Sequence, residues 1–117
     1  DSVIIPIQCE FFALEGLAQL LNTIKLVKKS INPKLKIKGF LPTMFSTQNN
    51  LSKQVFADLR QHAQIKLFKD KDDNYILVPR NVKLAEAPSF GKPAILYDVK
   101  STGAMAYQNL AQAIIAL

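Results

Sequence analysis

The side chains best suited to binding or catalysis lie in one polar stretch, residues 79–93, with the sequence PRNVKLAEAPSFGKP. It directly follows the apolar run YILV at residues 75–78, which is typical of a buried strand. Pro79 has no backbone N–H to donate, so it ends that strand. Charged and amide side chains therefore lie at the carboxyl end of a strand, where parallel α/β sheets bind their ligands. This stretch is the first candidate for a binding site.

The sequence lacks the motifs that hydrolytic enzymes need. A P-loop requires G-x-x-x-x-G-K-[ST], whose backbone N–H groups cradle phosphates and whose hydroxyl holds magnesium. Gly91-Lys92 is the one Gly-Lys pair, but Glu86 occupies the first glycine position and Pro93 follows the lysine. No apolar run ending in Asp resembles a Walker B motif, and there is no G-x-S-x-G. We expect no catalytic residue in this chain and no hydrolytic activity from it alone.

No metal site is predicted either. Cys9 is the single cysteine and lies among apolar residues, so we expect a small buried side chain in a reducing compartment. His62 has no Cys or second His nearby and is interpreted as a helix-surface residue. Residues 70–74, DKDDN, alternate acids as a calcium loop does. They lack its glycine and its closing glutamate, which favours a solvated turn.

Length and charge limit the possible function classes. The 117 residues suit one small domain, and 15 Lys and Arg against 9 Asp and Glu leave a net charge of +6. Such a balance suits a polyanionic partner, although a merely soluble basic surface gives the same count. No signal-peptide pattern or apolar run of about 20 residues argues for export or a membrane span. The chain begins with Asp and enters a strand at once, so we expect a piece of a longer protein.

The elements that position these residues alternate between strand and helix. Residues 3–7 are continuously apolar, which indicates a strand covered on both faces. A helix over about residues 13–30 carries one apolar stripe: Ala13, Leu17, Leu20, Ile24, Val27 and Ile31. A second strand follows at residues 36–44. A second helix, capped by an asparagine of residues 46–50 and ending near Gln64, presents Leu51, Val55, Leu59 and Ala63.

The remaining third of the chain follows the same order. Residues 75–78 are the third predicted strand, and residues 94–97 are either a short edge strand or an extended segment. Ser101 or Thr102 caps a last helix, with Tyr107, Leu110, Ile114 and Leu117 on one face. Alternating strands and helices predict a parallel α/β sheet.

Residues 79–93 also resemble a signature of the ParA/Soj chromosome-partitioning ATPases, the deviant Walker-A group of P-loop NTPases. The segments PIQCEFFALEGL at residues 6–17 and LLNTI at residues 20–24 are similar to that family as well. The resemblance covers nearly the whole chain but only the carboxyl half of such a protein. It implies that residues 1–117 are the C-terminal part of a three-layer, parallel-sheet P-loop NTPase-like fold, without the P-loop half.

The resemblance implies a function for the longer protein. Members of the family are ATPases that use ATP and magnesium, form dimers on ATP and bind DNA without sequence preference. They segregate chromosomes or plasmids on the nucleoid, in the cytoplasm, with a ParB-like centromere-binding partner. We expect none of these cofactors to bind tightly to this piece alone.

The sequence argues against one alternative to this interpretation and leaves a second one open. A MinD-like membrane ATPase needs a basic amphipathic helix, and residues 103–117 contain no Lys or Arg, so that alternative is rejected. A stand-alone, non-enzymatic DNA-binding or interaction α/β module stays open.

The resemblance also assigns candidate site residues. The adenine side would be formed by Thr43, Met44, Pro79, Arg80 and Asn81, and the loop facing nucleotide and partner subunit by Glu10 and Phe11. DNA would be bound by Lys83, with Lys53 near Gln48, where some members have an Arg. A purely structural role is the alternative to each of these assignments: core packing for Met44, a helix N-terminal carboxylate for Glu10, and a solvated surface role for each lysine.

Overall fold

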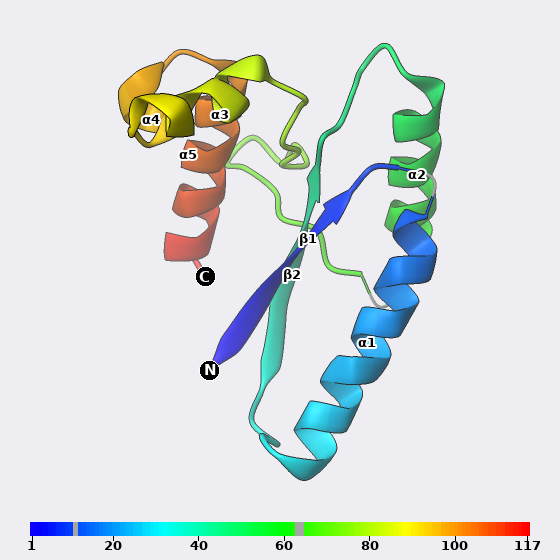
Figure 1. The fold of residues 1–117 in the computed structure, drawn as a ribbon. Coiled ribbons are helices and arrows are strands. Elements are labelled where there is room, and N and C mark those ends of the chain that lie inside the picture. The colour runs from blue at the N-terminus through cyan, green and yellow to red at the C-terminus, as the bar shows by residue number, and fades with distance from the viewer. Residues whose placement is uncertain (11, 63–64) are drawn as a thin grey trace.

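A parallel pair of strands forms the centre of the fold. The computed structural model describes residues 1–10, 12–62 and 65–117. Strand β1 (Ser2–Gln8) lies beside β2 (Lys36–Thr43), and helix α1 (Ala13–Ser30) connects them (Figure 1). Their pairing runs from Ser2 opposite Lys36 to Gln8 opposite Thr43, with one irregularity after Val3. This β-α-β unit confirms the predicted parallel arrangement.

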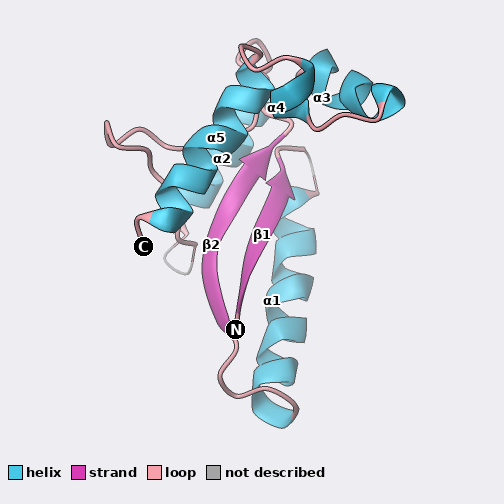
Figure 2. Ribbon diagram, turned by 90° about the vertical axis from the view of Figure 1, so that its left-hand side faces the viewer, coloured by secondary structure: helices cyan, strands magenta, loops and turns pink. Residues whose placement is uncertain are grey.

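Helices cover both faces of the strand pair. Helices α1 and α2 (Asn50–Gln61) lie on one side, and α3 (Val82–Glu86) and α5 (Thr102–Ile115) lie on the other (Figures 1 and 2). The short helices η1 (Ala87–Phe90) and α4 (Ala94–Tyr97) complete the second side. The three-layer α/β architecture expected from the sequence is therefore confirmed.

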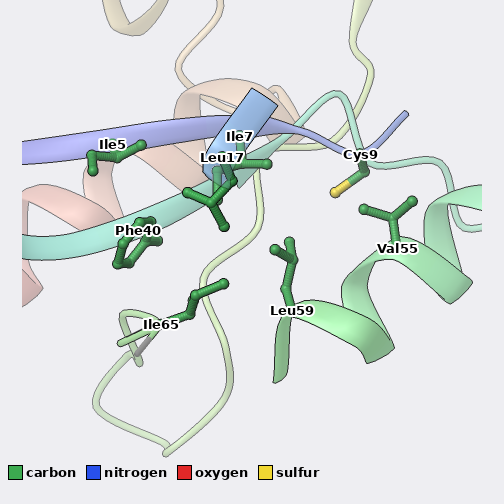
Figure 3. Close-up of a cluster of buried hydrophobic side chains, with 8 residues drawn as sticks. All are labelled: Ile5, Ile7, Cys9, Leu17, Phe40, Val55, Leu59 and Ile65. Atoms are coloured by element: carbon green, nitrogen blue, oxygen red, sulfur yellow. The ribbon is translucent and has the colours of Figure 1, made fainter. Parts of the chain in front are cut away.

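Each face of the strands has its own hydrophobic core. Because successive strand residues point to opposite faces, the neighbours Phe40 and Leu41 belong to different cores. Figure 3 shows the core on the α1 side, where side chains converge from both strands and from α1 and α2. Its buried members are Ile5, Ile7, Cys9, Leu17, Phe40, Val55, Leu59 and Ile65. The core on the α5 side comprises Leu41, Phe68, Ile76, Val78, Ala106 and Leu110.

The predicted bounds of α1 are confirmed, but two residues of its predicted apolar stripe, Leu20 and Ile31, are exposed, and Ile31 lies just past the end of the helix. Leu17 is buried and Leu21 packs against the same core, whereas Leu20 is 40% exposed. Leu21 lies four residues after Leu17, closer to a full number of helical turns on that face. The helix ends with Lys28 and Lys29 in its last turn, where cations favour the helix dipole.

Helices α2 and α5 begin at the predicted caps. The Asn49 side chain accepts a hydrogen bond from the Leu51 N–H at 2.8 Å, and the Ser101 hydroxyl accepts one from the Ala104 N–H at 3.2 Å. Helix α2 ends at Gln61, earlier than predicted, and residues 63 and 64 lie outside the described residues.

The predicted face of α5 was partly wrong. Its buried side is formed by small residues and one leucine, namely Gly103, Ala104, Ala106 and Leu110. Tyr107 and Leu117 are exposed. At the start of α5, Gly103 lies so close to Leu84 of α3 that no side chain would fit there.

Residues 75–78 do not form the regular third strand that the sequence predicts. The Ile76 N–H donates to the Phe68 carbonyl at 3.0 Å, within a hairpin, and only the Val78 N–H reaches β2, at the Pro42 carbonyl (2.9 Å). Pro42 has no N–H to donate in return, so no continuous ladder forms along this part of β2. Ile76 and Val78 are nevertheless buried beside it, as expected for this position.

Residues 94–97 were expected to be extended and instead form helix α4. Pro93 immediately precedes the helix, and its carbonyl accepts from the Tyr97 N–H at 2.9 Å. The helical turn brings Tyr97 onto Phe90, with ring centroids 5.1 Å apart. The helical conformation thus comes with a ring contact between Phe90 and Tyr97.

Candidate functional site

A hollow of about 600 Å³ lies where the two strands end, on the side covered by α3 and α5. We call it the strand-end hollow. All five residues predicted to form one side of a ligand site line it: Thr43, Met44, Pro79, Arg80 and Asn81. Pro6 and Gln8 of β1 and Tyr107 of α5 complete part of its wall. The structure thus brings together candidates separated by more than thirty positions in sequence.

The chain leaves β2 through a strained residue at this hollow. Met44 has φ 54°, in the left-handed region that side chains with a Cβ seldom adopt. Directly after it, the Phe45 N–H donates to the Val78 carbonyl at 3.1 Å, and the Arg80 N–H donates to the Phe45 carbonyl at 2.9 Å. These bonds fasten the two loops that form the hollow, and they hold Met44 in its unusual conformation. Such strain is concentrated at functional sites.

Asn81 is fixed by hydrogen bonds at both ends of its side-chain amide. Its oxygen accepts from the Lys83 N–H at 2.9 Å and so caps α3, while its nitrogen donates to the Thr102 hydroxyl at 2.7 Å. The second bond ties the start of α3 to the start of α5. Asn81 therefore shapes the wall of the hollow, and both of its polar atoms already have partners.

Arg80 joins the hollow to the loop after β1. Its guanidinium donates to Glu10 Oε1 at 2.9 Å, across 70 positions of sequence. Both residues also line a second hollow, of about 680 Å³, along the outer edge of β1 and α1. The other residue predicted in this loop, Phe11, lies outside the described residues. Glu10 is thus held by a cation rather than by the start of α1.

Lys83 lies on α3 beside a small polar cluster. Its ammonium is 3.9 Å from Glu86 Oε2 and 5.8 Å from the centroid of the Tyr97 ring, and its side chain is 43% exposed. The same Glu86 oxygen accepts a hydrogen bond from the Tyr97 hydroxyl at 2.7 Å. This hydrogen bond raises the pKa of Tyr97, and burial and nearby carboxylate charges add to the increase. Sequence reasoning missed Tyr97, because its partner depends on the helical turn of α4.

Lys53 and Gln48 do not join Lys83 in one patch. Both are exposed, on α2 and in the loop before it. Helices α2 and α3 lie on opposite sides of the strands, although α3 and the start of α2 are both near the strands' carboxyl ends (Figure 1). Lys53 and Lys83 therefore belong to helices on opposite sides of the strands.

Neither lone nucleophiles nor metal ligands add to this site. Cys9 is buried at 2% exposure, and burial raises the pKa of its thiol to about 11. His62 is exposed at the end of α2. Within the described residues, no group of three His, Cys, Asp or Glu side chains is arranged to hold a metal ion. Among the same residues, no helix is both long enough and apolar enough to span a bilayer.

Comparisons with known proteins relate this chain to a protein family and to named relatives. Residues 1–37 match the protein family described as "AAA domain". The chain is 51% identical over 115 residues to the chromosome partitioning protein ParA of Caulobacter vibrioides. It is 49% identical over 116 residues to the sporulation initiation inhibitor protein Soj of Bacillus subtilis. The resemblance to the ParA/Soj partitioning proteins is confirmed.

The similarity to ParA and Soj includes almost all of this chain but less than half of theirs. The two alignments cover 98% and 99% of the chain, and 41% and 44% of the relatives. The chain thus spans about two fifths of the ParA/Soj length.

Solved structures show the same fold relationship. Cobyrinic acid a,c-diamide synthase from Mycobacterium smegmatis matches with a TM-score of 0.68 and 30% identity. The match covers 97% of the chain and 37% of the synthase. Crystal structures of that synthase contain ADP and magnesium, or an ATP analogue and magnesium. The similarity places the chain within a fold that, in the synthase, holds an adenine nucleotide.

Proposed function

We propose that this chain is the carboxyl-terminal portion of an ATP-dependent chromosome or plasmid partitioning protein, and that the strand-end hollow receives the adenine of its nucleotide. The observation that carries the proposal is the convergence of the five assigned residues on one hollow at the carboxyl ends of parallel strands. The identity of about 50% with ParA and Soj supports it.

The residues of the hollow fit a nucleoside base. Pro79, Met44 and Val78 offer apolar surface for a flat ring, while Gln8 and Thr43 offer polar groups at one end. A volume of about 600 Å³ is in the usual range for small-molecule sites. The nucleotide would supply the phosphoryl group whose transfer drives the parent protein. This chain's residues would hold and orient the base, and we assign no magnesium ligand to them.

The same proposal includes the partners of the longer protein. ATP would favour a face-to-face dimer that binds DNA without sequence preference and meets a ParB-like centromere-binding protein on the nucleoid, in the cytoplasm. Lys83 would contact DNA from the α3 side and Lys53 from the α2 side. Their separation supports contacts to two stretches of backbone rather than to one.

Replacing Lys83 with Ala in the full-length protein tests the DNA part. With ATP, the variant should bind unrelated duplexes more weakly and to equal extents, and its log affinity against log salt should flatten by about one unit. The physical reason is the loss of one phosphate contact and of the counterion that it releases. Fluorescence anisotropy with labelled duplexes at several salt concentrations measures both quantities.

Lys71→Ala is the matched control, because Lys71 is an exposed lysine of the turn at residues 70–74 and has no assigned role. Unchanged affinity and slope in Lys83→Ala would show that this lysine is ordinary surface charge.

The alternative of a stand-alone, non-enzymatic module is tested by the coding sequence upstream of Asp1. A G-x-x-x-x-G-K-T within about 150 preceding codons would exclude it.

A further inference from the structure

Two polar side chains of the strands line the strand-end hollow and make no side-chain hydrogen bond within the described residues. One guanidinium nitrogen of Arg80 donates to Glu10, and both ends of the Asn81 amide have partners. Gln8 and Thr43 have no side-chain hydrogen bond within the residues described. Tyr107 adds a hydroxyl from α5, whereas Gln8 and Thr43 come from the strands themselves. Gln8 and Thr43 are therefore the polar side chains of the strands that are available to a ligand in this hollow.

Sheet register places these two side chains next to each other. Gln8 is the last residue of β1 and Thr43 is the last residue of β2, and they are direct partners in the parallel pairing. Neighbouring strands lie about 4.8 Å apart, and residues paired in this way point to the same face. Gln8 is exposed and Thr43 is half-buried. A carboxamide and a hydroxyl therefore stand side by side at the rim.

A carboxamide distinguishes the two purines by its pattern of donor and acceptor. Its oxygen can accept from the exocyclic amine of adenine while its nitrogen donates to the adjacent ring nitrogen N7. Guanine presents two acceptors, N7 and O6, at the same edge, so the carboxamide oxygen would face another oxygen. A hydroxyl can donate or accept, and so it can support either base.

We propose that Gln8, assisted by Thr43, is the residue that selects adenine over guanine in this hollow. The proposal rests on the proposed function of the hollow as the base site of a nucleotide. It adds a specificity-determining residue from β1 to a site otherwise assigned to the segments after β2 and after Val78.

The test measures base selectivity rather than affinity alone. Isothermal titration of the full-length protein with ADP and with GDP, each with magnesium, gives the ratio of the two dissociation constants. Gln8→Met keeps the length of the side chain and removes both polar groups. We expect it to lower the preference for ADP about tenfold or more, mainly through weaker ADP binding. Thr43→Val should lower the preference in the same direction by a smaller factor.

A second substitution at the same position keeps the test valid if Gln8→Met does not fold. Gln8→Glu keeps the shape but can only accept, so it loses the donor to the ring nitrogen and should also reduce the ADP preference. Its negative charge acts on the diphosphates of ADP and GDP alike, and the ratio therefore isolates the effect on the base. Gln61→Met, at an exposed glutamine at the end of α2, is the matched control and should leave the ratio unchanged.

The outcomes separate this inference from the function on which it rests. A wild-type protein that prefers ADP, together with Gln8 variants that keep the full preference, would overturn the inference and leave the proposed function standing. A wild-type protein that binds neither nucleotide would overturn both.

Discussion

Arg80 shows how a weak contact at a single residue can organise a site. Its side chain and that of Glu10 are 50% and 48% exposed, so solvent screens their attraction and the pair contributes at most about 1 kcal/mol to folding. Its value lies in orientation, because the bond fixes the loop after β1 against the loop after Val78. Pro6, Gln8 and Arg80 belong to the walls of both hollows, so this pair lies at their shared border.

Cys9 gives a prediction that depends on pH. Burial raises the pKa of its thiol from 9.0 to about 11, so at pH 8 the folded chain holds roughly 100-fold less thiolate than the unfolded chain. Because the folded chain holds less thiolate and buries the sulfur, reaction with Ellman's reagent should be much slower in buffer than in guanidinium. Equal rates would contradict the burial of Cys9.

The same pKa shift fixes how stability should change with pH. The folded state binds this proton more tightly than the unfolded state does. The stability that the folded state gains from this tighter proton binding is fully present below pH 9 and is lost as the pH rises from 9 towards about 11. Denaturant unfolding at a series of alkaline pH values follows this loss, and a Cys9→Ala variant serves as its control.

At the scale of elements, the junction of α3 with α5 depends on the lack of a side chain at Gly103. A Cβ built there would lie 2.5 Å from Leu84 Cγ, closer than packed carbon atoms can approach. Gly103→Ala should therefore push α3 away from α5 and destabilise the fold by about 1–3 kcal/mol. Denaturant unfolding of both proteins measures the difference.

Gly16 in α1 is the matched control for this substitution. A Cβ there would meet no atom within 4 Å. Gly16→Ala should stabilise the chain by about 0.5–1 kcal/mol, because alanine loses less backbone entropy in a helix. Equal effects of the two substitutions would exclude close packing as the cause.

A structural feature could be predicted from the sequence where residues close in the chain determine it, and not where distant partners do. The bounds of α1 and the caps at Asn49 and Ser101 follow from spacing and from side chains within a few residues. Residues 75–78 and α4 could not be predicted correctly, because their conformations depend on partners elsewhere, such as Phe68 for Ile76. Five residues of the strand-end hollow, Thr43, Met44, Pro79, Arg80 and Asn81, were assigned from the family resemblance, whereas Gln8 and Tyr107 were not assigned to it. The bond from Arg80 to Glu10, 70 positions away, had no local signal.

At the scale of the whole molecule, one edge of the strand pair and much of α1 have no cover. Within the described residues, β1 pairs only with β2, so its other edge presents unpaired backbone groups. Beside it, Leu20 of α1 lines the hollow along β1 and is 40% exposed. Apolar surface next to an open strand edge is a site at which chains associate.

The 117-residue chain should therefore form dimers or larger oligomers, or show poor solubility. Sedimentation velocity over a wide range of concentration measures its mass. A Leu20→Lys substitution should shift the distribution towards the monomer, because it places charge beside the open edge of β1. A single monomer mass for the unmodified chain at every concentration would contradict the prediction.

The burial of Cys9 also has a practical consequence for spectroscopy. Cys9 is the one cysteine of the chain, so the native surface presents no fast-reacting thiol. A cysteine introduced at an exposed position such as Lys71 would then take up a maleimide dye within a brief reaction at neutral pH. Cys9 can stay in place during this labelling, which avoids a cavity in the core that it shares with Val55 and Leu59. Dyes on α2, on α3 or on the turn at residues 70–74 would report movements of each element separately.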